Sequence, residues 1–247
     1  MFKRVAIEFA YDGTDFFGYQ IQPSVRTVQG ELEKALERIF KTKISTVAAG
    51  RTDTGVHACG QVVAFDCPNP RLSENDIRNA LNANLPSDIY VKRVWFPHEK
   101  FNPRYEAKKR IYHYYIFNGK LKNLFFRKYS WWFPYEIDIE AMREGARYLI
   151  GTHDFVAFSK KDEEKENTVK TIHNLRVIKL RREIILVRVE GISFLRGMVR
   201  SIVANLVKVG THQWPPERIR EVLLSKDRSE SAGLAPPHGL FLYRVLF

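Results

Sequence analysis

The chain has few cysteines and no long apolar run. Of its 247 residues only Cys59 and Cys67 are cysteines. Two thiols cannot form the disulfide framework that holds small secreted domains together, so we expect a reduced, cytoplasmic protein. No apolar stretch approaches the roughly 18 residues that a membrane-spanning helix needs, and the start at Met1 has no signal-peptide pattern. These absences predict neither a membrane anchor nor secretion.

The sequence also lacks complete patterns for metal or cofactor binding. His57, Cys59 and Cys67 are three soft metal ligands, but no clear fourth ligand and no Cys-x-x-Cys pair accompanies them. Residues 50–55 begin and end with glycine, yet the Gly-Lys-Ser/Thr ending of a phosphate-binding loop is missing. The sequence therefore predicts no zinc site and no cofactor.

Positive charge is in excess. The chain has 40 Lys and Arg against 28 Asp and Glu, a formal net charge of +12. Such an excess favours a polyanionic partner, of which nucleic acid is the commonest. An anionic membrane surface would also fit the charge. Seventeen Phe, eleven Tyr and four Trp supply rings on which bases could stack, although most aromatic side chains in any protein belong to the core.

The first part of the chain alternates strand and helix patterns. Thr27 can cap a helix with one apolar stripe, and Ser73 with Asp76 resembles a capping box that opens a second helix. Four segments have the apolar pattern of a strand: 2–11, 44–49, 61–65 and 89–96. The order β-α-β-β-α-β is that of ferredoxin-like folds, so we predict a fold of the α+β class.

The rest of the chain approximates the same order with insertions. Residues 98–109, rich in basic side chains and proline, are predicted to connect an N-terminal half (1–97) to a C-terminal half (110–247). In the second half we predict helices from Asp138, stopped by Gly151, and over 193–209 and 216–224, and an exposed polar loop over 160–167. Its predicted strands are 110–117, 169–180, 182–190 and 239–247.

The segment 49–60, Ala-Gly-Arg-Thr-Asp-Thr-Gly-Val-His-Ala-Cys-Gly, stands between two of the predicted strands. Its three glycines predict a loop rich in turns. Asp53 and Thr52 could simply hydrogen-bond their own backbone and close a turn. A loop fixed between two strands is equally suited to hold a reactive side chain in place.

The order of residues in this loop resembles the signature of the TruA-type tRNA pseudouridine synthases. Further blocks resemble the same family and occur in family order over almost all of the chain: 11–20, 26–33, 82–86, 101–104, 110–114, 194–200 and 239–242. Two departures are small: Tyr19 stands where tryptophan is frequent, and Thr54 stands where alanine is frequent.

The resemblance implies an activity, a partner and a more detailed fold. It implies isomerisation of uridine to pseudouridine at positions 38–40 in the anticodon stem-loop of tRNA, by a homodimer that needs no cofactor. The reaction breaks the bond between ribose C1′ and uracil N1 and reattaches the base through C5. The resemblance assigns the catalytic carboxylate to Asp53. It also implies that both halves are ferredoxin-like, or RRM-like, and that their antiparallel sheets are joined.

Two arginines are candidate ion-pair partners of Asp53. Arg51 is two residues away and would point the same way in an extended segment, whereas the resemblance favours Arg200. Arg196 and Arg200 would share a face of the predicted helix, which could be a solvated basic stripe. However, that helix carries apolar residues nearly all round, and an arginine on a buried helix must find a partner.

The resemblance assigns roles to three further substrate-binding residues. It places Arg51 near the RNA backbone, where a guanidinium matches phosphate. Tyr112 would stack on the target uracil, and Leu240 would form an apolar wall of the uracil pocket. From the residues alone, Tyr112 could be an ordinary strand aromatic and Leu240 plain core. For His57 we prefer a structural or RNA-contacting role.

Two rival functions fit parts of the sequence. A non-catalytic RRM-like RNA-binding protein would explain the charge and the aromatic side chains. It would leave the Arg-Thr-Asp loop unexplained, and no RNP-type aromatic consensus appears on the predicted strands. A nucleoside hydrolase would also use a carboxylate at C1′, but a net charge of +12 is unneeded for a small neutral substrate.

Overall fold

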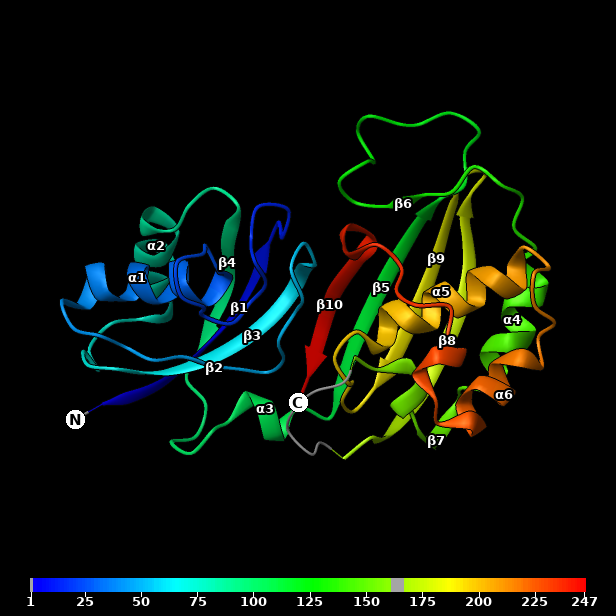
Figure 1. Cartoon of the computed structure of the whole chain (residues 1–247). Helices are drawn as coiled ribbons and strands as arrows, with labels where there is room; N and C mark the ends of the chain where they lie inside the picture. Colours follow the sequence, from blue (N-terminus) through cyan, green and yellow to red (C-terminus); the bar gives the residue numbers. More distant parts are fainter. Residues whose placement is uncertain (1, 161–166) are drawn as a thin grey trace. The chain divides into compact units, whose positions relative to one another are not determined.

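The computed structural model describes residues 2–160 and 167–247, so the loop expected over 160–167 falls largely outside the described residues. The chain divides into two units, each with strands and helices (Figure 1). Unit 1 consists of Met1–Lys108 and Leu242–Phe247, and unit 2 of Lys109–Phe241. The α+β class predicted from the sequence is confirmed.

The sheet of unit 1 has the ferredoxin-like strand order. Strand β1 (Lys3–Tyr11) lies between β3 (His57–Cys67) and β4 (Ile89–Trp95) and is antiparallel to both. The short strand β2 (Val47–Ala48) also pairs with β3. Because Val63 and Ala64 pair with β1 as well as with β2, these two strands occupy opposite edges of β3, which gives the order β4-β1-β3-β2.

The two longer helices of unit 1 begin where the sequence predicts. Helix α1 (Val28–Phe40) is capped by Thr27, whose hydroxyl accepts a hydrogen bond from Gly30 N at 3.3 Å. Helix α2 (Glu74–Asn84) opens with the predicted capping box of Ser73 and Asp76. The segment predicted as a connector contains a one-turn helix, α3 (Pro103–Glu106).

The end of the chain completes unit 1. Strand β10 (Leu240–Leu246) begins in unit 2 and ends in unit 1. A Cβ atom on Gly60 would lie 2.7 Å from the carbonyl oxygen of Tyr243, so only glycine lets β10 approach β3 this closely. Lys108 N donates to Leu246 O at 2.9 Å, and the Phe247 ring packs on Phe101 at 5.1 Å between centroids.

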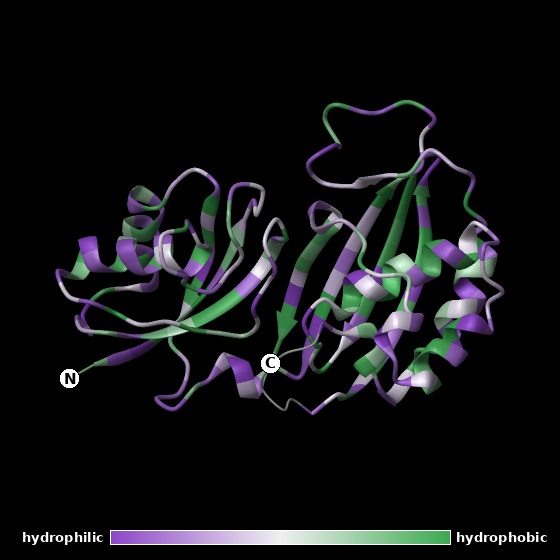
Figure 2. Cartoon of the chain, in the orientation of Figure 1, coloured by the Kyte–Doolittle hydropathy of each residue, from purple (hydrophilic) through white to green (hydrophobic). Residues whose placement is uncertain are grey.

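In unit 2 an antiparallel sheet is covered by helices. Its strand order is β5 (Lys109–Phe117), β9 (Ile184–Gly191), β8 (Val169–Arg181) and β7 (Gly151–Asp154), and β6 (Trp131–Trp132) pairs in parallel with β5. The helices are α4 (Ile139–Arg147), α5 (Met198–Gly210) and α6 (Arg218–Ser225). Three short 3-10 turns are η1 (Val156–Phe158), η2 (Arg228–Glu230) and η3 (Pro237–Gly239). Figure 2 shows hydrophobic residues along the central strands and mixed residues on the helices.

The bounds of four predicted elements are wrong. The helix expected over 193–209 begins only at Met198, because Gly197 adopts a left-handed φ of 74° at its N-terminus. Helix α4 is stopped by Tyr148 rather than by Gly151, which instead opens β7 at a φ of 112°. The strand expected over 44–49 shortens to β2, and the strand expected over 61–65 lengthens to β3.

Candidate active site

The loop that carries Asp53 is fixed to the strands on either side of it. Ala49 N donates to Val62 O at 2.8 Å, and the Gln61 side chain donates to Gly50 O at 2.8 Å. Val56 N donates to Asp53 O at 3.1 Å and closes a turn. The Asp53 main chain therefore makes the local turn that the sequence allowed, and its side chain remains partly exposed.

The segment that follows β1 holds the loop from the other side. The Tyr11 hydroxyl and the Thr52 hydroxyl lie 2.7 Å apart in the buried interior. Tyr19 N donates to Thr52 O at 3.1 Å, and Gly55 N donates to Phe16 O at 3.3 Å. Thr52 is thus bound through both its side chain and its carbonyl, which fixes the backbone beside Asp53.

His57 is buried where β3 begins, and it anchors the turn after β1. Its Nδ1 lies 3.0 Å from the Gly13 backbone nitrogen, which donates to it, and 3.1 Å from Asp12 Oδ1. Asp12 Oδ1 also accepts hydrogen bonds from the backbone and the hydroxyl of Thr14, at 3.0 and 2.5 Å. Of the structural and RNA-contacting roles expected for His57, these contacts favour the structural one.

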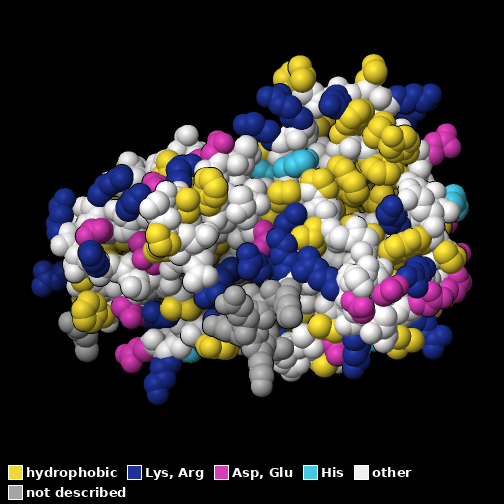
Figure 3. All heavy atoms as spheres, viewed as in Figure 1, with side chains coloured by type: hydrophobic (Ala, Val, Ile, Leu, Met, Phe, Trp, Pro, Cys, Tyr) yellow, Lys and Arg dark blue, Asp and Glu magenta, His cyan; other side chains and the backbone are white. Residues whose placement is uncertain are grey.

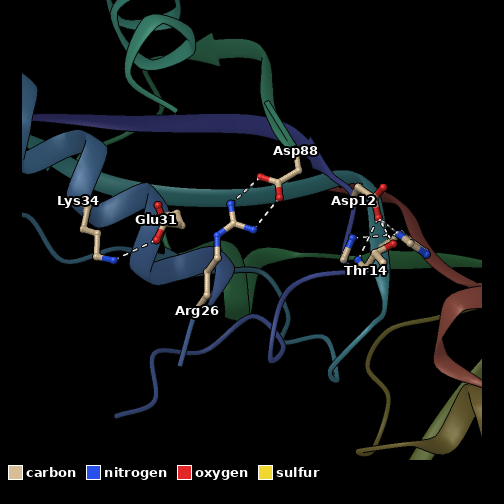
Figure 4. Close-up of polar contacts among 8 residues, drawn as sticks. Asp12, Thr14, Arg26, Glu31, Lys34 and Asp88 are labelled. Carbon is tan, nitrogen blue, oxygen red and sulfur yellow. Dashed lines mark hydrogen bonds and ion pairs between the residues drawn. The ribbon is translucent and has the colours of Figure 1, made fainter. Parts of the chain in front are cut away.

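An ion pair between Arg26 and Asp88 stabilises the turn that follows β1. The Arg26 guanidinium donates to both carboxylate oxygens of Asp88, at 2.7 and 2.9 Å (Figure 4). The hydrogen bond to Asp88 is the main reason why the pKa of Arg26 is raised. Arg26 also lies over the Phe16 ring at 4.1 Å, and Asp88 O accepts from Asp12 N at 3.0 Å.

These supporting residues were not singled out from the sequence as site residues. Tyr11, Gly13 and Arg26 lie within segments that resemble the family, and this was the only sequence signal that could have found them. Their partners Thr52, His57 and Asp88 are 41 to 62 residues away along the chain. No local pattern reveals pairings over such separations.

Three of the predicted substrate-binding residues lie in unit 2. Tyr112 on β5 is 7% exposed, and its ring meets Phe194 edge-on at 5.1 Å between centroids. Arg200 on α5 is half-buried, and its Nε donates to Ala235 O at 2.8 Å. Leu240, at the start of β10, is buried.

The segment 235–240 contacts both Arg200 and strand β5. Ala235 N donates to Arg200 O at 3.1 Å, and the Tyr114 hydroxyl donates to Pro236 O at 2.8 Å. Burial raises the pKa of Tyr114, and the charge of Arg200 opposes that shift. A Cβ atom on Gly239 would lie 2.7 Å from Tyr114 Cζ, so glycine is required beside Leu240.

Asp53 and Arg51 thus lie in unit 1, whereas Tyr112, Arg200 and Leu240 lie in unit 2. The pairing of Asp53 with Arg200 stays a prediction. Arg51 is exposed on the loop. Arg196 precedes Gly197 and lies outside α5, so the prediction that Arg196 and Arg200 share a helix face is wrong.

The described residues contain neither a cluster of metal ligands nor a membrane-spanning helix. No group of three or more His, Cys, Asp or Glu side chains within residues 2–160 and 167–247 could hold a metal ion. In the same part of the chain no helix is both long and apolar enough to cross a bilayer. Burial raises the pKa of both thiols, Cys59 and Cys67.

Comparison with known proteins identifies the family. The family model described as tRNA pseudouridine synthase matches residues 7–106 and 146–247. A protein of Fervidobacterium nodosum named tRNA pseudouridine synthase A is 74% identical over 245 residues, which are 99% of this chain and 100% of the relative. Proteins of the same name from Thermosipho africanus and Thermotoga maritima are 63% and 59% identical over the same shares of both chains. This chain therefore belongs to the tRNA pseudouridine synthase family and is an isomerase that converts uridine to pseudouridine.

Proposed function

We propose that the enzyme acts on the anticodon stem-loop of tRNA, at positions 38–40, and that Asp53 is its catalytic carboxylate. The observation that supports the assignment of Asp53 is the double anchoring of its loop. Thr52 is held by Tyr11 and Tyr19, and Gly55 by Phe16. A carboxylate that must meet one carbon atom of a bound nucleotide needs this fixed placement, because displacements of about 1 Å can cost 100-fold in rate.

The reaction sets a clear task for the residues of the site. The bond between C1′ and N1 breaks, the uracil rotates, and a new bond forms between C1′ and C5, while C5 loses a proton and N1 gains one. No atom is added or lost, so the site must hold the free base between the two steps. We assign the Tyr112 ring to stack on the base and Leu240 to close the pocket. The burial of both side chains supports an apolar pocket in which a released base stays bound.

Mapping pseudouridine on tRNA incubated with the purified enzyme tests the proposed target. We expect modification at positions 38–40 and none when the uridines there are replaced by cytidine. Modification confined to other positions would contradict the proposed target and would leave the family assignment intact.

We further propose that Arg200 forms an ion pair with Asp53. Arg200→Ala should then lower both turnover and stability, because it leaves a carboxylate without its counter-charge. In a double-mutant cycle with Asp53→Ala, the two losses of unfolding free energy should differ from additivity by about 0.5–3 kcal/mol. Arg196 is an exposed neighbour outside α5, and Arg196→Ala is the control. Its change in unfolding free energy should be additive with that of Asp53→Ala. Strict additivity for Arg200 would make Arg51 the preferred partner.

Arg51 is proposed to contact an RNA phosphate. A chain of net charge +12 should lose affinity for tRNA steeply as salt rises, by about one unit of log–log slope for each phosphate contacted. Arg51→Ala should weaken binding and lower that slope by about one. Arg71→Ala removes another exposed arginine, from the turn before α2, and should leave the slope unchanged. An unchanged slope for Arg51→Ala would remove this residue from the RNA interface.

We also propose that the enzyme is a homodimer in the cytoplasm. The family resemblance supports the dimer, and the scarcity of cysteine supports the compartment. Sedimentation of the purified protein decides the oligomeric state.

A further inference from the structure

A segment of unit 2 that the proposed mechanism does not use carries exposed apolar side chains. Residues 118–135, here called the aromatic loop, leave the end of β5, extend beyond the sheet and return through β6 (Figure 1). Six of its large apolar side chains are between 40% and 87% exposed: Leu121, Leu124, Phe125, Phe126, Tyr129 and Tyr135. So many exposed apolar side chains in one segment are typical of a binding surface.

The charge of the aromatic loop indicates what binds there. Residues 118–135 contain no Asp or Glu and four basic residues: Lys120, Lys122, Arg127 and Lys128. In Figure 3 hydrophobic and basic side chains alternate over this part of the surface. A second copy of the chain would bring a loop of the same positive charge against a protein of net charge +12. RNA satisfies both features, because its phosphates pair with the cations and its bases stack on the rings.

The aromatic loop encloses a hollow of about 220 Å³. Phe126 forms one wall and packs on Phe117 at 5.7 Å between ring centroids. Trp132 forms another wall and is fixed by donation from its Nε1 to Gly119 O at 3.0 Å. The hollow is smaller than the roughly 300–1,000 Å³ of sites for drug-sized ligands, and a single flat ring suits its size and its aromatic walls.

Two cationic side chains lie at the same hollow. The Lys122 ammonium stands 4.8 Å from the centre of the Trp132 ring, and Arg127 Nη1 donates to Leu124 O at 2.7 Å. A base bound against Phe126 would therefore have cations within reach of its phosphate. Aromatic walls with adjacent Lys and Arg are the usual means of binding unstacked bases without reading their sequence.

The hollow is also close, within unit 2, to residues assigned to the uracil pocket. His238 of η3 lines it and stands two residues before Leu240. Phe117 and Tyr112 lie on the same strand, five residues apart, which corresponds to about 16 Å at 3.3 Å per residue. The odd separation places their side chains on opposite faces of β5, so RNA that contacts both has to pass the end of the strand, a path that a few nucleotides span.

We propose that this hollow binds a second, unstacked base of the same tRNA, a few nucleotides from the target uridine. The inference rests on the proposed function, since it assumes that RNA carrying the target lies along β5. The hollow adds affinity and positions the RNA strand, and it takes no part in the chemistry. Loops of RNA offer bases that can be splayed out in this way.

Phe126→Ala tests the proposal through RNA affinity. Loss of one stacking ring should raise the Kd for tRNA roughly 5- to 150-fold, with kcat at saturating tRNA nearly unchanged. Lys122→Gln should lower the salt slope of binding by about one. The matched controls are Phe125→Ala and Lys120→Gln, which lie on the aromatic loop outside the hollow and should bind tRNA as the unsubstituted enzyme does.

Several results would overturn the proposal. A Kd for Phe126→Ala within about twofold of the unsubstituted value would remove the hollow from the RNA interface, as would equal losses in Phe126→Ala and Phe125→Ala. A change in sedimentation with unchanged RNA affinity would assign the surface to a second copy. If Phe126→Ala does not fold, Phe126→Leu and Lys122→Gln provide the same comparison. Because binding is measured without turnover, an enzyme that bound tRNA normally but formed no pseudouridine would refute the proposed function alone.

Discussion

Asp53→Asn is expected to abolish pseudouridine formation while the fold and tRNA binding are retained. Asparagine keeps the shape of the side chain and loses the negative charge, so the reaction loses its carboxylate. We expect turnover to fall roughly 1,000-fold or more. The unfolding free energy should change by less than about 1 kcal/mol, because asparagine can still accept a hydrogen bond from the guanidinium proposed to face it, and the Thr52, Gln61 and backbone hydrogen bonds that anchor the loop remain.

The measurement is single-turnover pseudouridine formation, with thermal unfolding and tRNA binding followed on the same samples. Thr54→Ala is the matched control: it alters the next residue, which is exposed, and should keep full activity. Residual turnover of Asp53→Asn above about a tenth of the unsubstituted rate would disprove the catalytic assignment.

Gly13→Ala is expected to inactivate the enzyme without touching any reacting group. A Cβ atom on Gly13 would lie 2.0 Å from the carbonyl oxygen of Val56 and 3.2 Å from the backbone nitrogen of His57. Both are backbone atoms, so the loop that carries Asp53 has to move. We expect a loss of about 1–3 kcal/mol in stability and a fall in kcat of about 100-fold or more.

Gly233→Ala is a control that separates instability from displacement of the loop. Gly233 has a φ of 84° and no atom within 4 Å of its added Cβ, so alanine there is strained but displaces nothing. This variant should lose about 1–2 kcal/mol of stability and retain its kcat below its melting temperature. Full activity of Gly13→Ala would show that the turn after β1 does not set the position of Asp53.

Local signals account for what the sequence predicted well. Thr27 and Ser73 bond to backbone groups three residues away, so the helix starts at these positions are encoded within one turn. The start of α5 could not be predicted in this way. The apolar pattern of the helix already begins at 194–195, although the chain becomes helical only at Met198. The left-handed conformation of Gly197 prevents the helix from starting earlier, and the spacing of apolar residues carries no information about the φ angle of a glycine.

The residues of the candidate site also fall into two groups, those that the sequence indicates and those that it does not. Asp53 and Arg51 are candidates from the residue order of one loop, and Tyr112, Arg200 and Leu240 are candidates from segments that resemble a family. The residues that hold the loop in place could not be recognised. The pairs His57–Gly13 and Arg26–Asp88 join positions 44 and 62 residues apart, and periodicity along the chain carries no information about them.

The discontinuity of unit 1 has a consequence for how the enzyme is made. Its second segment, Leu242–Phe247, follows all of unit 2 along the chain, so unit 2 is synthesised before it. Until then β3 lacks the neighbour that approaches Gly60, and Phe101 lacks the ring of Phe247. A nascent or prematurely terminated chain therefore cannot complete the unit that carries Asp53. The segments of unit 1 are therefore brought together in two stages, and the second stage follows the synthesis of unit 2.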